Sequence, residues 1–262
     1  DEPAAIHGTR EPRHAAVAGP IAPRDATVGG SLPRAARLMG DRRSPAGSLC
    51  PICMPATLLS HQALVLPLKL RWPQRFSGLA LCIGSMAPDL EFIARMSDDW
   101  LFSHTLHAQL WFTLPVTVLL HWLLTAVLLP ALLPYLRDHP GLRLHDLAAL
   151  APPRSSAEWL TVCISAVIGG ASHVVLDGIT HGNHSGWLVP WLPFLRTPVP
   201  HPGGEVPLHD ALQLWLTIGL AIVTAVLWQY IARHRLLWRW RAQRARALPR
   251  QPRGDGHRLL VA

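Results

Sequence analysis

Charged residues are scarce in this 262-residue chain, where they make up 15% of the composition against 50% hydrophobic residues. Ordinary soluble domains carry about 25% charged residues, so this balance, with a mean hydropathy of +0.22, favours a membrane protein. The chain also lacks a phosphate-binding glycine loop and a Gly-x-Ser-x-Gly nucleophile elbow. Neither a nucleotide-binding loop nor a serine hydrolase of that type is therefore predicted.

Cysteine is equally sparse, with four residues in the chain. Cys82 and Cys163 lie within apolar runs, where cysteine packs as a small hydrophobe. Cys50 and Cys53 have the spacing of a metal or redox pair, but no second pair and no βαβ pattern accompanies them, so we interpret them as incidental. The cysteines predict no disulfide framework.

Basic residues outnumber acidic ones by 24 to 16 and crowd toward the two ends of the chain. Because they flank long apolar runs, anionic lipid headgroups are a simpler partner for them than nucleic acid. We interpret the arginine run 233–253 as a juxtamembrane anchor rather than a nucleic-acid arm. The expected partners are the lipid bilayer and a small-molecule or lipid substrate that the sequence does not identify, with no nucleic acid.

The composition divides the chain into three regions. Residues 1–53 are rich in Ala, Pro, Arg and Gly without apolar periodicity, so we predict a disordered or misassigned N-terminal extension, with no secretory signal. Met54 opens the more structured part. Residues 54–232 are predicted to form a membrane helical domain, and residues 233–262 a basic cytoplasmic tail.

Four apolar segments have the length of about 20 residues that a helix needs to cross a bilayer. A shorter stretch, 56–70, is interrupted by His61 and Pro67 and predicts an interfacial or re-entrant helix. The predicted fold class is therefore an all-α, polytopic helical membrane bundle. The four predicted spans are 76–96, 109–133, 159–179 and 211–231.

Lys and Arg alternate between the connections. Connection 97–108 has neither, connection 134–158 carries Arg137, Arg143 and Arg154, and connection 180–210 carries one arginine. Positive residues are retained on the cytoplasmic side. The pattern predicts a multi-pass protein of the cell membrane with both termini cytoplasmic.

The first span contains two carboxylates, Asp89 and Glu91, directly after Pro88. An Asp at the centre of a span is unfavourable by roughly 2.5–3.5 kcal/mol, so its presence calls for a role. Two positions two residues apart are separated by about 200° around a helix, and we expect Asp89 alone to face a site. The alternative is a helix-start carboxylate that follows a proline.

His104 and His107 stand three residues apart at the outer end of the second span, a spacing that suits a shared ligand on one helical face. Ser103 and Thr105 flank His104 and are placed to orient its ring. The alternative is a wet interfacial pair, which applies most to His107. His121, alone within the second span, is interpreted as a packed histidine.

The third span carries His173, Asp177 and His181 at intervals of four residues. An interval of four residues exceeds a full turn of the helix by only about 40°, so the three side chains form one polar stripe. Imidazole and carboxylate are ordinary ligands for Zn²⁺ or a similar divalent ion. The alternative is a polar seam between helices, and Gly169 and Gly170 would let a neighbouring helix approach closely.

The predicted topology brings these clusters to one depth. Asp89, His104 and the stripe of the third span all fall in the outer half of the bilayer. His61 precedes the first span on the nominally inner side, and joins the others only if segment 56–70 dips into the bundle.

Four motifs resemble the domain of unknown function 4184 family, a bacterial family of multi-span membrane proteins, over residues 54–232. The pattern is more distantly similar to predicted membrane-bound metal-dependent hydrolases. In the last span the family tends to place a His after Gln, whereas Leu214 follows Gln213 here, so that span is expected to supply no ligand. The motifs are Ser60-His61, Gly84-Ser85-Met86-Ala87-Pro88-Asp89, Ser103-His104-Thr105 and Ser172-His173-x-x-x-Asp177-x-x-Thr180-His181.

The resemblance and the residues together favour a metal-dependent hydrolase with a site near the extracytoplasmic face and a divalent ion, zinc, as cofactor. Asp89 would orient a ligand or act as general base. The alternatives are a transporter or proton relay, against which the absence of inverted repeats argues, and a structural bundle. The expected metal ligands are His61, His104, His173, Asp177 and His181.

Overall fold

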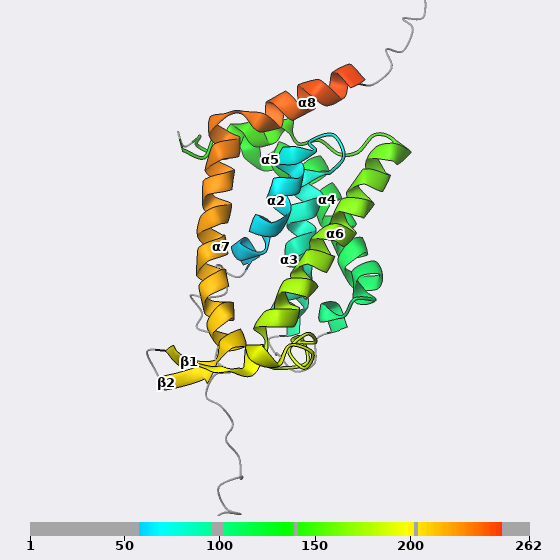
Figure 1. The fold of residues 1–262 in the computed structure, drawn as a ribbon. Coiled ribbons are helices and arrows are strands. Elements are labelled where there is room, and N and C mark those ends of the chain that lie inside the picture. Colours follow the sequence, from blue (N-terminus) through cyan, green and yellow to red (C-terminus); the bar gives the residue numbers. More distant parts are fainter. Residues whose placement is uncertain (1–57, 96–101, 139–140, 202–203, 248–262) are drawn as a thin grey trace, which may run out of the picture. The chain divides into compact units, whose positions relative to one another are not determined.

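The computed structural model describes residues 58–95, 102–138, 141–201 and 204–247, and nearly all of its regular structure is helical (Figure 1). The predicted all-α class is confirmed. A two-stranded antiparallel hairpin, in which Val199 pairs with Val206, is an addition that the sequence did not predict. The labelled elements are α2 Gln62–Arg71, α3 Gly78–Arg95, α4 Leu114–Trp122, α5 Leu129–Leu132, α6 Ser156–Thr180, β1 Pro198–His201, β2 Gly204–Pro207, α7 Leu208–Arg233 and α8 Leu236–Ala247.

Three helical runs among the described residues are long and apolar enough to cross a membrane. They coincide with the second, third and fourth predicted spans. The first predicted span corresponds to α3, which has 18 residues and carries Asp89, Glu91 and Arg95, so its composition is more polar than that of the other three. The three runs are Gln109–Tyr135, Ser156–Thr180 and Leu208–Arg233.

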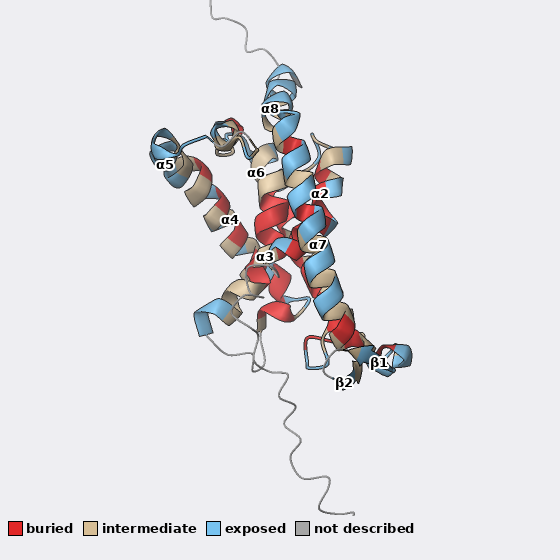
Figure 2. Ribbon diagram, turned by 90° about the vertical axis from the view of Figure 1, so that its left-hand side faces the viewer, coloured by how far each residue is buried: buried red, intermediate tan, exposed pale blue. Residues whose placement is uncertain are grey.

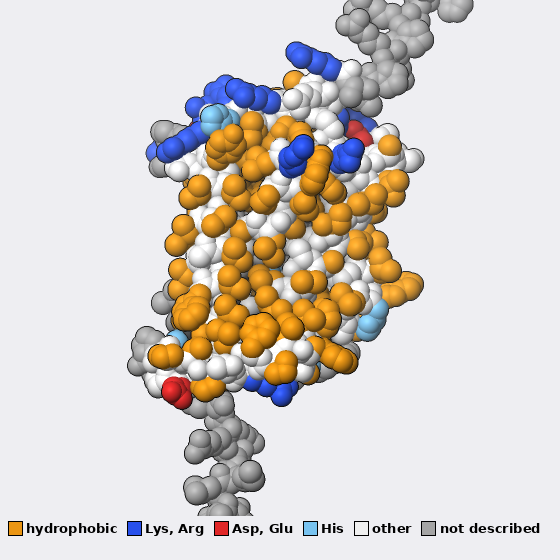
Figure 3. Space-filling model, viewed as in Figure 1, with side chains coloured by type: hydrophobic (Ala, Val, Ile, Leu, Met, Phe, Trp, Pro, Cys, Tyr) orange, Lys and Arg blue, Asp and Glu red, His pale blue; other side chains and the backbone are white. Residues whose placement is uncertain are grey.

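The outer surface of these helices is apolar. Trp111 is 78% exposed, and Leu119, Ile222 and Val226 are each 59% exposed. Figure 3 shows hydrophobic side chains spread over the flank of the molecule, with most of the visible Lys and Arg at the end where α8 lies and a smaller basic group at the other end. Such a surface is typical of a protein that is embedded in a lipid bilayer. The chain is therefore a membrane protein.

Helix α6 forms the centre of the bundle together with α3. At its start, the Ser155 hydroxyl accepts from the backbone N–H of Glu158 at 3.3 Å, and the Glu158 carboxylate accepts from the backbone N–H of Arg154 at 2.7 Å. This reciprocal capping fixes where the helix begins. The helix ends at Thr180, because His181 adopts an extended backbone (φ −113°, ψ 140°).

Glycines allow α3 and α6 to approach closely. A Cβ atom at Gly84 would lie 2.5 Å from the backbone oxygen of Ala166, and one at Gly169 would lie 2.5 Å from that of Leu81. Small residues at such a crossing permit direct backbone contact. Figure 2 shows the buried residues concentrated along this pair, whereas α7 and α8 are largely exposed.

Helix α2 has only 10 residues and packs among α3, α6 and α7. Two hydrogen bonds fasten its start to α7: the Thr224 hydroxyl donates to the Leu59 carbonyl at 2.8 Å, and the Trp228 indole donates to the Gln62 side chain at 3.0 Å. The predicted short helix therefore enters the bundle, and it carries His61 inward with it.

The predicted N-terminal region, residues 1–53, and its Cys50–Cys53 pair lie outside the described residues. Of the predicted basic tail, residues 236–247 form α8, a helix that the sequence pattern did not predict.

Candidate metal centre

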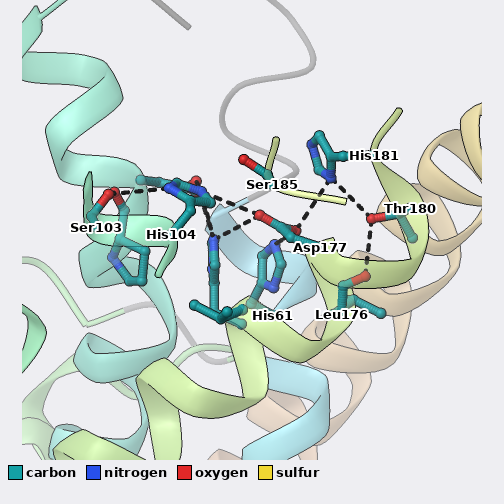
Figure 4. Close-up of polar contacts among 12 residues, drawn as sticks. His61, Ser103, His104, Leu176, Asp177, Thr180, His181 and Ser185 are labelled. Carbon is teal, nitrogen blue, oxygen red and sulfur yellow. Dashed lines mark hydrogen bonds and ion pairs between the residues drawn. The ribbon is translucent and has the colours of Figure 1, made fainter. Parts of the chain in front are cut away.

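Six side chains singled out in the sequence lie together at the end of the bundle away from α8. They come from the start of α2, from α3, from the short 3₁₀ turn Phe102–His104, and from α6 with its C-cap. Figure 4 shows the rings of His61, His104 and His181 around the carboxylate of Asp177. The six are His61, Asp89, His104, His173, Asp177 and His181.

Three of these residues form a nearly equilateral triangle of donor atoms. The Nε2 atoms of His104 and His173 lie 3.3 Å apart, and Asp177 Oδ2 lies 3.2 Å from the first and 3.1 Å from the second. All three residues are buried. Nitrogen and oxygen ligands of tetrahedral zinc stand about 3.3 Å from one another, given bonds of about 2.0–2.1 Å. These buried groups could hold a metal ion.

Asp89 approaches the same histidines from α3. Its Oδ1 lies 3.4 Å from His173 Nε2 and 3.6 Å from His104 Nε2. Its Oδ2 is buried and has no hydrogen-bond partner. Glu91 points elsewhere: it accepts from the backbone N–H of Ser103 at 2.7 Å and from Arg95 at 2.9 Å. The two carboxylates thus have separate tasks, as their angular separation on a helix predicts.

The ring of His173 is oriented by the backbone of α3. Its Nδ1 lies 2.8 Å from the carbonyl oxygen of Ser85. A carbonyl only accepts, so Nδ1 donates and the ring's lone pair is on Nε2. That nitrogen faces His104 and both aspartates. Partners of this kind fix the tautomer of metal-binding histidines.

His104 is oriented in the same manner by the residue before it. The Ser103 hydroxyl donates to the Pro88 carbonyl at 2.8 Å and therefore accepts from Nδ1 of His104, 3.1 Å away. Nε2 again is the nitrogen that faces the centre. Burial alone would lower the pKa of His104, but hydrogen bonds to Asp177 and Asp89 outweigh burial and raise it. The two aspartates thus favour a positive charge beside them.

His61 stacks on His173, with ring centroids 3.8 Å apart and an angle of 24° between the rings. Its Nε2 lies 3.7 Å from Asp177 Oδ1, while its Nδ1 is buried without a hydrogen-bond partner. With Asp89 and His173 it forms a second group whose donor atoms could hold a metal ion. The condition set for His61, that its segment dips into the bundle, is met.

His181 lies at the margin of the centre. Its Nδ1 is 3.7 Å from Asp177 Oδ1 and 3.1 Å from the Thr180 hydroxyl, and its Nε2 is 3.0 Å from the side-chain amide of Gln213. Both ring nitrogens therefore have protein partners. The last spanning helix contributes Gln213 to this arrangement instead of a histidine.

Gln109 is a residue of the site that sequence reasoning missed. Its side-chain amide donates to the carbonyls of Ser103 and Thr105, at 3.0 and 2.9 Å, and so ties the turn that carries His104 to the start of the second spanning run. Gln109 opens a stretch of wider π-helical turns, Gln109–Thr113, a feature frequent at functional sites. In the sequence, this role was indicated only by a single amide side chain at one end of an apolar segment.

His107 and His121 lie outside the centre. The expected helical face shared by His104 and His107 is not formed, because the 3₁₀ turn ends at His104, a bend and a turn follow it, and His107 is exposed. His121 packs inside the bundle, its Nε2 3.3 Å from the Ser77 hydroxyl.

A family model described as Domain of unknown function (DUF4184) matches residues 54–250. The matched segment contains every residue of the centre. No curated protein and no solved structure matches the chain.

Proposed function

We propose that this chain, which belongs to the domain of unknown function 4184 family, is a membrane-embedded metal-dependent hydrolase. The observation that carries the proposal is the triangle of His104, His173 and Asp177. Two imidazole nitrogens and one carboxylate oxygen, with a fourth position left for water or substrate, are the donor set of many catalytic zinc sites. Zinc is the divalent ion that we propose for this set, because two histidines and one carboxylate are ligands of catalytic zinc.

The donor set fits a divalent ion for two further reasons. Each histidine of the triangle is held by a partner that turns Nε2 inward, as the contacts with Ser85 and Ser103 indicate. The buried, unpartnered atoms His61 Nδ1 and Asp89 Oδ2 lie beside the triangle, and buried polar atoms of this kind ordinarily have a partner.

In the proposed mechanism His104, His173 and Asp177 would hold the ion and shield it from bulk solvent. When bound, the ion would supply Lewis acidity that lowers the pKa of water toward neutrality. Asp89 would accept the proton of that water at its unpartnered Oδ2 and so act as general base. His61 and His181 flank Asp177, and either completes the ligand set or positions the carboxylate. The substrate class is a phosphoester or a related bond.

The centre is proposed to face the extracytoplasmic side. Helix α8, which is rich in arginine, lies at the opposite end of the bundle (Figure 1), where the positive-inside rule puts the cytoplasm.

Metal analysis of the purified full chain tests the proposal. We expect about one zinc ion per chain, lost when His173→Ala is combined with Asp177→Ala. His107→Ala is the matched control, because this histidine is exposed and lies outside the centre, and it should keep the metal. Wild-type protein free of stoichiometric metal, or a double variant that retains it, would overturn the assignment.

Hydrolysis is tested separately with phosphomonoester and phosphodiester probes on zinc-loaded protein. The proposal requires turnover by the wild type and none by the double variant. Vesicles that carry the wild type, monitored for ion flux, address the transporter alternative: metal binding together with flux and without hydrolysis would replace the enzyme by a transporter.

A further inference from the structure

A cavity of about 220 Å³ lies at the end of the bundle opposite the metal centre. Its walls come from α2, α3, α6 and α7, and α8 crosses this end of the molecule (Figure 1). Much of the wall is apolar, formed by residues such as Leu66, Cys82, Val162, Ile231 and Leu237. A cavity with this lining accepts hydrocarbon.

The rest of the wall is strongly basic. Four basic side chains, Lys69, Arg154, Arg241 and Arg244, line the cavity together with a single carboxylate, Glu158. That carboxylate is shared, because it accepts from the Arg154 backbone at 2.7 Å and lies 3.9 Å from Arg244. The lining therefore has an excess of positive charge that its own acidic residue does not neutralise.

Lys69 is the clearest sign of this imbalance. It is 7% exposed, and its ammonium donates to the carbonyls of Pro73 and Phe76, at 2.5 and 2.8 Å. The same nitrogen lies 4.8 Å from the ring centroid of Trp240. Burial, and then the nearby Arg244, lower the pKa of Lys69 to about 7. A neighbouring anion would stabilise the charged form.

His121 adds an unsatisfied polar atom to the same wall. Its ring is 4% exposed, and its Nδ1 has no hydrogen-bond partner, while its Nε2 contacts Ser77. A buried imidazole nitrogen without a partner is unusual in a folded protein, and this one belongs to a residue of the cavity wall.

We propose that this cavity binds an anionic phospholipid, with the phosphate among the basic side chains and the start of an acyl chain along the apolar wall. Three observations support a lipid rather than a soluble anion. The wall is mainly apolar, the cavity lies at one end of a bundle whose flanks face lipid, and Trp228 and Trp240 line it, as indole rings do at headgroup level.

Native mass spectrometry of the full, delipidated chain tests the proposal by titration with phosphatidylglycerol and phosphatidylcholine. We expect one phosphatidylglycerol to bind at least tenfold more tightly than phosphatidylcholine. Arg241→Gln combined with Arg244→Gln should abolish this preference. Arg239→Gln combined with Arg246→Gln is the matched control: it removes the same charge from α8 at positions that do not line the cavity, and should change the affinity less than twofold.

Equal loss in both double variants would mean general attraction to the basic helix and would overturn the proposal, as would equal affinity for the two lipids. Competition with inorganic phosphate distinguishes a lipid ligand from a free anion. If phosphate displaces phosphatidylglycerol at equal concentration, the acyl chain contributes nothing and the proposal fails. Val162→Phe, which fills the apolar wall and keeps every charge, should weaken lipid binding; unchanged binding contradicts the assigned position of the chain.

Discussion

At the scale of single residues, the metal centre depends on hydrogen bonds that orient imidazole rings. His173 is turned by a backbone carbonyl, which no substitution removes, whereas His104 is turned by the hydroxyl of Ser103. The two rings therefore differ in how readily their orientation can be disturbed.

Ser103→Ala removes the partner of His104 Nδ1 and frees the ring to rotate. We expect the affinity for zinc to fall by about 10–100-fold, measured by competition with a chromophoric chelator. Ser172→Ala is the control, since Ser172 precedes His173 but its hydroxyl bonds to the Gly169 carbonyl within the same helix. An equal loss in both variants would mean that removal of either hydroxyl near the centre weakens zinc binding, and would contradict a specific effect on the ring of His104.

Asp89→Asn keeps the size of the side chain and removes its basicity. If Asp89 is the general base, the zinc content should remain and the rate of hydrolysis should fall by about 10²–10⁴-fold. Metal content and turnover are measured on the same preparation. Loss of zinc in this variant would instead make Asp89 a ligand.

At the scale of helices, the close crossing of α3 and α6 sets the distance between Asp89 and the histidine stripe. Gly84 and Gly169 stand at this crossing, with neighbouring backbone where a Cβ atom would be. The precision of the centre therefore depends on residues that take no part in its chemistry.

Gly169→Val forces the two helices apart. We expect a loss of stability of about 1–3 kcal/mol and of metal binding, followed by thermal unfolding in detergent and by metal analysis. Gly219→Ala on α7 is the control, because a Cβ atom there meets nothing within 4 Å. That change should be neutral or should stabilise the helix by about 0.5–1 kcal/mol. A stable Gly169→Val protein with intact metal would contradict the role of this crossing.

The sequence predicted helices correctly where one property, such as the length of an apolar segment or the helical period, determines the structure. Three spans follow from length and apolarity, and all of their observed ends lie within three residues of the predicted ones. The polar stripe on α6 follows from helical period. The pairing of His104 with His107 was wrong because it assumed one regular helix over both residues, whereas the 3₁₀ turn ends at His104 and a bend and a turn follow it.

The sequence pattern could not predict the tertiary contacts of the site. The stack of His61 on His173 depends on hydrogen bonds from Thr224 and Trp228, which are far away in the chain. The contact of Gln213 with His181 likewise joins two helices whose relative rotation no periodicity specifies. Helix α8 was not predicted because its many arginines are typical of a solvated tail.

At the scale of the whole molecule, charge and chemistry occupy opposite ends. Figure 1 shows the arginine-bearing helix α8 at one end of the bundle and the C-terminal end of α6 at the other. Residues of α8 line the lipid cavity, and the C-terminal part of α6 carries His173 and Asp177 of the metal centre. This polarity allows the proposed orientation in the membrane to be tested without reference to activity.

Two single-cysteine variants report the orientation, made in a background without the native cysteines. Leu142→Cys lies in the connection that precedes α6, and Trp191→Cys lies in the one that follows it; the native side chains are 60% and 79% exposed. A membrane-impermeant thiol reagent applied to intact cells should modify position 191 and spare position 142. The reverse pattern would place the metal centre on the cytoplasmic side.

Helix α2 belongs to both ends of this arrangement. Its N-cap is His61, and Lys69 stands in its last turn, about 12 Å further along the axis at 1.5 Å per residue. One short helix thus contributes a residue to the metal centre at its start and a residue to the lipid cavity in its last turn. Because both residues belong to one short helix, a displacement of α2 would change the candidate metal centre and the cavity together.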